Sequence, residues 1–395
     1  MLSRREILRA AAATGAAVLL RPGLAALARL DDGTSFADDR AVVLIELTGG
    51  NDGLNTVVPF ADDLYHRARP ALRHRPEAVH KIDATLGYAP ALSRIAALHR
   101  DGLVRLELGV GMERPDRSHF ESLDRWHTGL GAPDGRAEGW LGRALAETAQ
   151  AAGAGAFPGL ALGDRAMPRV LAGAGPGVVA CDSLRELSPS AATRRMLRSP
   201  AFEAALSAGA SAGDRALDAA ARALGESLDE LLRRDVASAK IPKTDLGRRL
   251  EDAWRLLDGP IRTRAIFVRT GGFDTHVRQD QTHPGLLSDV DGALSAFVRA
   301  LQAGGRLDRV LVVVYSEFGR RVAENGGRGT DHGSAGPVLL CGGGLPAGVF
   351  GERPDLGRLD DGDIRATTDF RRIPATALRH LGHPKPAHLG APPLG

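Results

Sequence analysis

Carboxylates and imidazoles, the side chains that bind divalent metals, recur at several places in this sequence, each time beside a short apolar run. Together with one serine they are Asp52, Ser118, His119, Asp274, His276, Glu317, Asp331 and His332. Zinc accepts histidine nitrogen and carboxylate oxygen, while manganese and magnesium prefer oxygen. Carboxylates gathered in one cleft would repel each other, and a cation relieves that repulsion. We therefore expect a site for one or two divalent ions, with zinc, manganese or magnesium as candidates.

The apolar runs predict that these side chains meet at one edge of a β-sheet. Parallel strands that are covered on both faces are almost continuously apolar, and the runs of this kind are 41–47, 103–108, 265–269, 310–315 and 337–341. Four of the polar motifs follow such a run, and open parallel sheets bind ligands outside the carboxyl ends of their strands. Asp331 and His332 instead precede the run 337–341, and they join the others if their loop returns across the same edge.

Helical patterns separate the runs, which predicts a parallel α/β sheet sandwiched between helices. In 285–303, for example, apolar residues recur at spacings of three and four along one stripe. We expect one domain over residues 38–390, with 160–245 as a helical insertion or cap. The chain has two cysteines, Cys181 and Cys341; we expect each to be a buried apolar residue, and the sequence leaves their pairing open.

The excess of basic over acidic residues is confined to the first 28 residues of the chain. The formal net charge is +3, and residues 1–28 hold four arginines against one glutamate, so the remaining chain is neutral. A neutral body argues against a nucleic-acid-binding protein. Arg4 and Arg5, the apolar run 10–20 and the small residues Ala26 and Ala28 resemble a twin-arginine export signal, and that run is too short to span a bilayer. We expect the twin-arginine translocase as a partner, a periplasmic or secreted location, and no transmembrane anchor in the mature chain.

Each motif by itself also fits an ordinary structural explanation. These explanations are a turn at Asp52-Gly53, a capping box formed by Ser118 and Glu121, a salt bridge between Glu317 and Arg320, and a hydrogen-bonded loop pair at Asp331-His332. A capping box does not exclude catalysis, because a helix N-terminus also stabilises an anion beside the serine. The other histidines, including His127 and His283, fit surface or helix-end positions. The recurrence of the motifs at strand ends is the feature that favours a functional site.

At these motifs the chain resembles DUF1501, a bacterial family of exported proteins of unknown function. The matching segments are GGNDGLNTVVP (49–59), RSHFESLDRWHTG (117–129), LGRRL (246–250), GGFDTH (271–276), SEFGRR (316–321) and GTDHGSAG (329–336). That family is grouped with the alkaline phosphatase/sulfatase superfamily. The resemblance therefore implies an alkaline phosphatase-like three-layer α/β sandwich, with a mainly parallel central sheet, helices on both faces and a metal site at the edge of the sheet.

The superfamily pattern implies roles for three of the strand-end residues. Asp52 resembles the first ligand aspartate, Ser118 the nucleophile at the start of a helix, and His332 the last histidine ligand. The sequence around Ser118 is loosely similar to the sulfatase signature, but it contains no cysteine that could become formylglycine. The resemblance therefore argues against a typical sulfatase.

The chain departs from the superfamily pattern at two further motifs. Asp274 resembles the aspartate of an Asp-x-x-x-His metal motif, yet Arg278 occupies the histidine position and His276 follows two residues after the aspartate. Glu317 and Phe318 occupy the place of an Asp-His pair, and Phe318 cannot bind a metal. One complete metal site with a depleted second site would fit these departures.

Two functional hypotheses follow. The first is an exported metal-dependent hydrolase of phosphate or sulfate esters, acting on a small anionic ester or glycan. Its residues would be Ser118 and His119 in catalysis, Asn51, Arg117 and Arg320 at the substrate, and Asp52, Asp274, His276, Glu317, Asp331 and His332 at the metal. The second is a catalytically inactive member of the superfamily that acts as a binding or assembly protein of the cell envelope. No Gly-x-Gly-x-x-Gly motif follows the first strand, which disfavours a dinucleotide cofactor.

Overall fold

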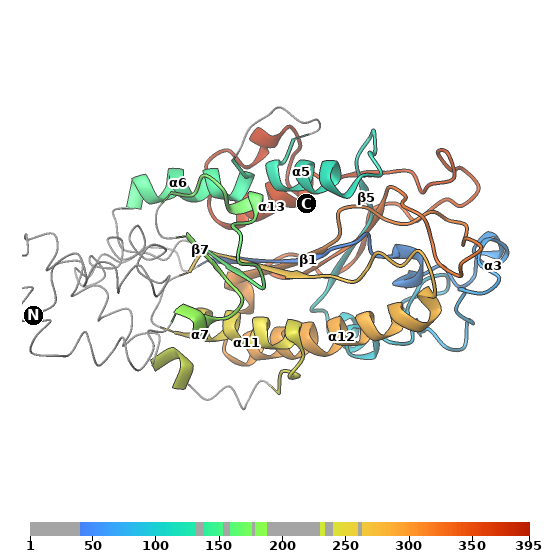
Figure 1. Ribbon diagram of the computed structural model, residues 1–395, viewed down its shortest axis with the longest axis horizontal. Helices are drawn as coiled ribbons and strands as arrows, with labels where there is room; N and C mark the ends of the chain where they lie inside the picture. Colours follow the sequence, from blue (N-terminus) through green and yellow to red (C-terminus); the bar gives the residue numbers. More distant parts are fainter. Residues whose placement is uncertain are drawn as a thin grey trace, which may run out of the picture.

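The computed structural model describes residues 40–130, 138–152, 159–175, 178–187, 230–233, 240–259 and 263–395. Over these residues a nine-stranded sheet lies between two layers of helices (Figure 1). The predicted fold class, a three-layer α/β sandwich with a mainly parallel central sheet and helices on both faces, is confirmed. The export signal and most of the predicted insertion lie outside the described residues, and the single domain over 38–390 stays a prediction.

One direction is shared by eight strands of the sheet, which are β1 (Ala41–Leu47), β5 (Arg105–Gly111), β6 (Gly159–Leu162), β7 (Val178–Cys181), β8 (Ala265–Thr270), β9 (Val310–Tyr315), β11 (Gly348–Phe350) and β12 (Thr368–Asp369). The strand order is β11-β5-β10-β9-β1-β8-β6-β7, and β12 also pairs with β5. The central strand β1 pairs in parallel with β8 on one side and with β9 on the other. A separate small sheet contains β2 (Val57–Val58), β3 (His80–Lys81) and β4 (Gly87–Tyr88).

The strand β10 (Gly336–Gly342) runs antiparallel to both of its neighbours, β9 and β5. The prediction that the run 337–341 is a parallel strand is therefore wrong. Because β10 is reversed, it begins at the edge where the parallel strands end. This direction brings Asp331 and His332, which precede β10, to the same edge as the residues that follow β1, β5, β8 and β9.

Helices cover both faces of the sheet (Figure 1). One face carries α5 (His119–Thr128), α6 (Trp140–Ala152) and α13 (Arg372–His380), and the other carries α4 (Ser93–Arg100), α7 (Leu184–Leu187), α11 (Asp245–Asp258) and α12 (Gln279–Ala303). Alternate residues of β1 supply the two cores, since successive strand side chains point to opposite faces. Val43 and Ile45 pack with α12, while Val42 and Leu44 pack with α5 and α6. The remaining short elements are α3 (Asp63–Ala68), η1 (Gly53–Asn55), η2 (Arg169–Leu171), η4 (Leu307–Arg309) and η5 (Pro386–Leu389).

The helix α12 begins at Gln279, earlier than the predicted Gly285, and it includes Pro284. Its additional first turns carry Gln279 and His283, which are both buried. His127, in α5, is buried as well. His127 lies in the last turn of α5, as the helix-end prediction has it, but neither His127 nor His283 is a surface residue, because both rings reach polar partners inside the fold.

Both cysteines are buried and free, as predicted for apolar positions, and they do not form a disulfide with each other. Burial raises the pKa of Cys181 to about 12 and that of Cys341 to about 12. Among the described residues, no helix has the length and apolar character that crossing a membrane requires.

A buried carboxylate, Glu46 of β1, anchors α5 to the sheet. His127 of α5 lies 2.6 Å from Glu46 Oε2, Arg269 Nε donates to Oε1 at 2.8 Å, and the Tyr315 hydroxyl donates to Oε2 at 2.9 Å. Burial alone would raise the pKa of Glu46, but the interactions with His127 and Arg269 outweigh it and lower the pKa to about 2. The carboxylate is therefore ionised and fully paired at neutral pH, and it fixes the helix whose first residue is His119.

We predict that Glu46→Gln lowers the free energy of unfolding at pH 7 by about 3 kcal/mol, because His127, Arg269 and Tyr315 lose the buried anion that they share and Arg269 keeps only its pair with Asp164. A lowered pKa means that the stabilisation by Glu46 is present above its unfolded-state pKa, near 4.5, and is lost as the pH falls towards 2. Urea unfolding at pH 7, 4 and 3 should show that the difference in unfolding free energy between the wild type and Glu46→Gln shrinks at low pH.

The control is Asp101→Asn, which removes an exposed ion pair with Arg299 and should lower the free energy of unfolding by less than about 1 kcal/mol. A loss at Glu46 no larger than at Asp101 would contradict the prediction.

Candidate metal centre

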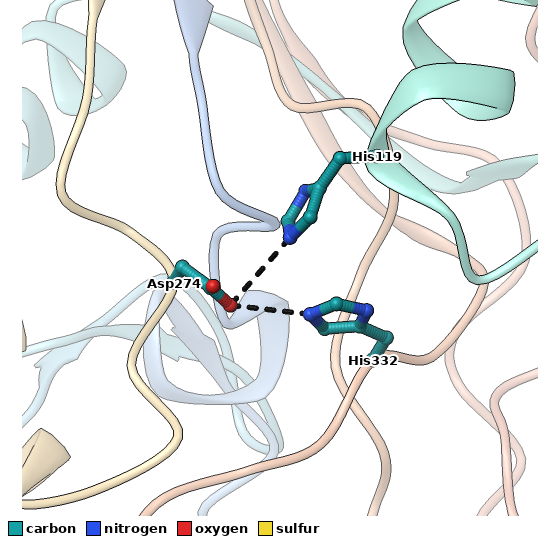
Figure 2. Close-up of side chains that lie close together, drawn as sticks. All are labelled: His119, Asp274 and His332. Carbon is teal, nitrogen blue, oxygen red and sulfur yellow. Dashed lines mark hydrogen bonds and ion pairs between the residues drawn. The ribbon is translucent and has the colours of Figure 1, made fainter.

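Three side chains from distant parts of the chain converge at the edge of the sheet (Figure 2). His119 is the first residue of α5, Asp274 lies in the loop after β8, and His332 lies in the loop before β10. His119 Nε2 is 3.6 Å and His332 Nε2 is 3.1 Å from the same atom, Asp274 Oδ1. The cluster is partly open to solvent, since the Asp274 side chain is 49% exposed and that of His119 is 27% exposed.

A third imidazole, His276, reaches the same carboxylate oxygen. Its Nε2 lies 3.0 Å from Asp274 Oδ1 and 2.9 Å from His332 Nε2. Ligand atoms bound about 2.1 Å from a tetrahedral zinc ion lie about 3.4 Å apart. The distances within the cluster are close to that value, and the donor set of imidazole nitrogen and carboxylate oxygen is the one that zinc accepts.

The far nitrogen of each ring faces an oxygen acceptor. The acceptors are Glu317 Oε1 for His119 Nδ1 at 2.7 Å, Asp331 Oδ1 for His276 Nδ1 at 3.2 Å, and the Arg117 carbonyl oxygen for His332 Nδ1 at 2.7 Å. Ionised carboxylates and carbonyl oxygens only accept hydrogen bonds, so each Nδ1 carries the proton. In the neutral rings each Nε2 then presents a lone pair to the cluster. The lone pairs of His276 and His332 would repel at 2.9 Å, so this contact needs an extra proton or a metal cation between the rings.

Glu317 lies behind His119, on the ring nitrogen that faces away from Asp274. Its buried carboxylate accepts from His119 Nδ1, from Gly49 N at 2.8 Å and from the Ser316 hydroxyl at 2.9 Å. The hydrogen bond with Glu317 raises the pKa of His119. A carboxylate in this position orients the imidazole and increases its basicity as a metal ligand. The sequence predicts Glu317 as a metal ligand. In the structure, Glu317 instead binds His119, which is itself a candidate ligand.

Asp274 is held in its ionised form by its neighbours. Burial alone would raise its pKa, but the hydrogen bond from Arg320 and the contacts with His332 and His276 outweigh this effect and lower the pKa to about 2. Arg320 Nη2 donates to Asp274 Oδ1 at 2.7 Å. The salt bridge of Arg320 is therefore with Asp274, and the alternative of a Glu317–Arg320 pair is not what the structure shows. Asp331, which also accepts from Asn325 at 3.0 Å, lies one ring away from the cluster and contacts it through His276.

Asp52 lies outside the cluster, in a fully buried ion pair. Arg69 Nη1 donates to Asp52 Oδ2 at 2.5 Å, Gln279 Nε2 donates to the same oxygen, and Asn55 N donates to Oδ1 at 3.3 Å. Burial alone would raise the pKa of Asp52, but Arg69 outweighs it and lowers the pKa. Asp52 also caps the short helix η1, so the turn explanation describes its local structure.

Two residues of this buried network escaped the sequence analysis for different reasons. Nothing in the local sequence distinguishes Arg69 from its neighbours Arg67 and Arg73. Gln279 was missed because the predicted helix began at Gly285. A buried carboxylate needs a cationic partner, and this requirement was the one signal that could have indicated Arg69. It can be used only when Asp52 is known to be buried.

Ser118 stands at the N-terminus of α5, directly before His119. It has the extended backbone of an N-cap residue, but its side chain makes no capping hydrogen bond, so the capping box with Glu121 does not form. Its backbone N–H donates to Asp116 Oδ1 at 2.8 Å. The hydroxyl is therefore not used to cap the helix, and it lies at the end where the helix dipole favours negative charge.

The three residues predicted to contact substrate already have partners within the protein. Arg117 pairs with Asp361 and Asp363, in each case at 2.8 Å. Asn51 is buried, donates to the Thr56 hydroxyl at 2.9 Å and accepts from His283 at 2.9 Å. The Arg320 guanidinium is buried and binds main-chain carbonyl oxygens in addition to Asp274. Their predicted contacts with substrate stay predictions.

The fold and site define an α/β sandwich with a histidine–aspartate cluster at the carboxyl edge of its parallel strands. Residues 106–386 match the family described as "Protein of unknown function (DUF1501)", and the chain belongs to this family. The resemblance inferred from the motifs is thus confirmed. A comparison with curated proteins gives no significant match.

Solved structures that match this chain include a protein in the alkaline phosphatase superfamily from Vibrio parahaemolyticus, a sulfatase and a phosphonate monoester hydrolase. The Zn complex of the C-terminal periplasmic domain of EcEptC from Escherichia coli is 12% identical, with 80% of this chain and 76% of that chain covered and a TM-score of 0.39. The PsFucS1 sulfatase from Pseudoalteromonas sp. is 12% identical (92% and 72% covered, TM-score 0.40), and the phosphonate monoester hydrolase SpPMH from Silicibacter pomeroyi is 11% identical (90% and 76% covered, TM-score 0.41). At this degree of similarity they add no argument about the function of this chain.

We predict that Glu317→Gln weakens zinc binding by about 10- to 100-fold, because His119 loses the anion that orients its ring. Competition with a chromophoric chelator measures the affinity. The matched control is Glu324→Gln, in the same loop after β9, where the carboxylate caps Ala71 N and Leu72 N and touches no residue of the cluster. Equal affinity in the wild type and Glu317→Gln would show that this hydrogen bond does not support a metal ligand.

Proposed function

We propose that this protein is a metal-dependent hydrolase of phosphate or sulfate esters. The observation that carries the proposal is the convergence of three imidazole Nε2 atoms on Asp274 Oδ1, with each Nδ1 hydrogen-bonded to an oxygen. Under this proposal His119, Asp274 and His332 hold a divalent ion, with His276 as the fourth ligand. When bound, such an ion supplies positive charge to the ester oxyanion and polarises it for attack.

The contacts of the other carboxylates favour one ion over two. The charge of Asp52 is balanced by Arg69. The Glu317 carboxylate accepts hydrogen bonds from His119, Gly49 N and the Ser316 hydroxyl. Asp331 binds the far side of His276. Moving Glu317 or Asp331 to a second ion would break the hydrogen bonds that orient His119 and His276, and moving Asp52 would leave Arg69 buried without its anion. Zinc fits the imidazole-rich set best, although manganese and magnesium belong in the test.

Ser118 is the proposed nucleophile and lies one residue from His119. Its hydroxyl makes no bond to the helix, so attack on phosphorus or sulfur would not first cost a capping interaction. The N–H groups of the first turn of α5 lack helical partners and can stabilise negative charge beside the serine. The proposed substrate is a small anionic ester or a glycan that carries such an ester.

The second candidate is a catalytically inactive binding or assembly protein of the cell envelope. The observation that favours it is that Asn51 and Arg320 are buried and that Arg117 already pairs with Asp361 and Asp363, so each residue predicted to contact substrate has partners within the protein. Export through the twin-arginine translocase to the periplasm or the medium is part of both proposals, and its support is the sequence of residues 1–28.

The experiment is an assay of the purified protein with nitrophenyl phosphate and nitrophenyl sulfate in the presence of zinc, manganese or magnesium. We predict metal-dependent turnover, a loss of at least about 100-fold in Ser118→Ala with metal retained, and loss of both metal and turnover in His332→Ala. His80→Ala, a histidine outside the cluster, is the control and should keep both. Stoichiometric metal without turnover of either ester would favour the binding protein, and absence of metal in the wild type would overturn the metal centre.

A further inference from the structure

The guanidinium of Arg320 is buried at the centre of the loops that carry the cluster. It is 1% exposed. Its Nε donates to Gly50 O at 2.6 Å, Nη1 to Thr330 O at 2.7 Å, and Nη2 to Asp274 Oδ1 at 2.7 Å, to Phe273 O at 3.1 Å and to Gly49 O. One side chain thus binds four main-chain carbonyl oxygens and one carboxylate from three separate loops.

Each candidate ligand is linked to this guanidinium by a short path. Asp274 accepts from it directly, and His332 follows Thr330 by two residues. For His119 the path runs through Gly49, whose oxygen accepts from Arg320 while its N–H donates to Glu317, the partner of His119 Nδ1. The guanidinium is therefore placed to set the relative positions of ligands that lie more than 200 residues apart in the sequence.

The chain is shaped locally to bring its carbonyls to Arg320. Gly49 has φ 118° and Gly50 has φ 72°, values that favour glycine. A Cβ on Gly49 would lie 2.4 Å from Asp274 N, and a Cβ on Gly50 would lie 2.3 Å from the Phe318 ring. Gly49 therefore allows the loop after β1 to pack directly against the loop that carries Asp274, and Gly50 allows it to pack against Phe318 in the loop after β9.

We propose that Arg320 is a positioning residue for the metal centre, which holds Asp274 and the three loops in the arrangement that binds the ion and does not itself contact the substrate. This inference rests on the metal site of the proposed function. The planar fork of arginine can serve acceptors in several directions at once, whereas a lysine ammonium cannot reproduce that geometry. Buried carbonyl groups left without donors would move, and the ligands would move with them.

Arg69 provides a matched comparison within the same chain. It is equally buried and joins loops in a similar way, through Asp52, Asn55 and the carbonyl oxygens of Arg321 and Val322. None of these partners belongs to the proposed ligand set. Arg69 should therefore share the contribution of Arg320 to stability but not its contribution to metal binding.

The test measures zinc affinity by chelator competition, and thermal unfolding with and without zinc, for the full chain and for Arg320→Lys, Arg320→Gln and Arg69→Lys. We expect both lysine variants to unfold at a lower temperature than the wild type. We expect the Arg320 variants to bind zinc about 10- to 100-fold more weakly, and Arg69→Lys to stay within about threefold of the wild type. If Arg320→Lys does not fold, the zinc affinity of Arg320→Gln tests the same role.

The outcomes separate this inference from the proposed function. Zinc affinity in the Arg320 variants equal to that of the wild type, or an equal loss in Arg69→Lys, would overturn the positioning role while leaving the metal site intact. A wild-type chain that binds no zinc would overturn the metal site itself. Weakened zinc binding in the Arg320 variants of a protein that hydrolyses no ester would support the positioning role and remove only the catalytic proposal.

Discussion

The structure at the edge of the sheet depends on how buried carboxylates and carbonyl oxygens are neutralised. Arg320 is the clearest case, since its guanidinium satisfies acceptors from the loops after β1 and β8 and from the loop before β10. A buried polar group without a partner costs free energy, so loops that converge in the interior need donors that reach all of them. Arginine is suited to this place because its donors are fixed in one plane and point in several directions.

The same principle divides the acidic residues of the site into two kinds. Asp52 and Glu46 have their charge balanced inside the protein by Arg69 and Arg269. Asp274 is different, because its Oδ1 faces three imidazole nitrogens as well as Arg320, and its side chain remains half exposed. Under the proposed function, this difference would direct a divalent cation to Asp274 and away from Asp52, although the two aspartates follow neighbouring parallel strands.

The fold class was predictable from local sequence, and so was the position of His119, Asp274, His276 and His332 at one edge of the sheet. Apolar runs identified β1, β5, β8, β9 and β10, and the motifs beside them supplied the residues that now meet. The role of each residue at this edge was harder to predict from the sequence than its position. Glu317 was predicted as a ligand and lies instead behind His119, because the partner of a ring nitrogen depends on contacts across the fold, 198 residues apart in this case.

The sequence by itself determined which segments form buried strands and which polar residues stand at their ends, because both properties arise from side chains that are close along the chain. It also determined the neutral charge of the body and the presence of two glycines after β1. Only the tertiary structure decided that β10 runs antiparallel, that Arg69 forms an ion pair with Asp52 and that Arg320 forms one with Asp274. These outcomes depend on which buried charge finds which counter-charge when distant loops pack together, and the local sequence does not encode that choice.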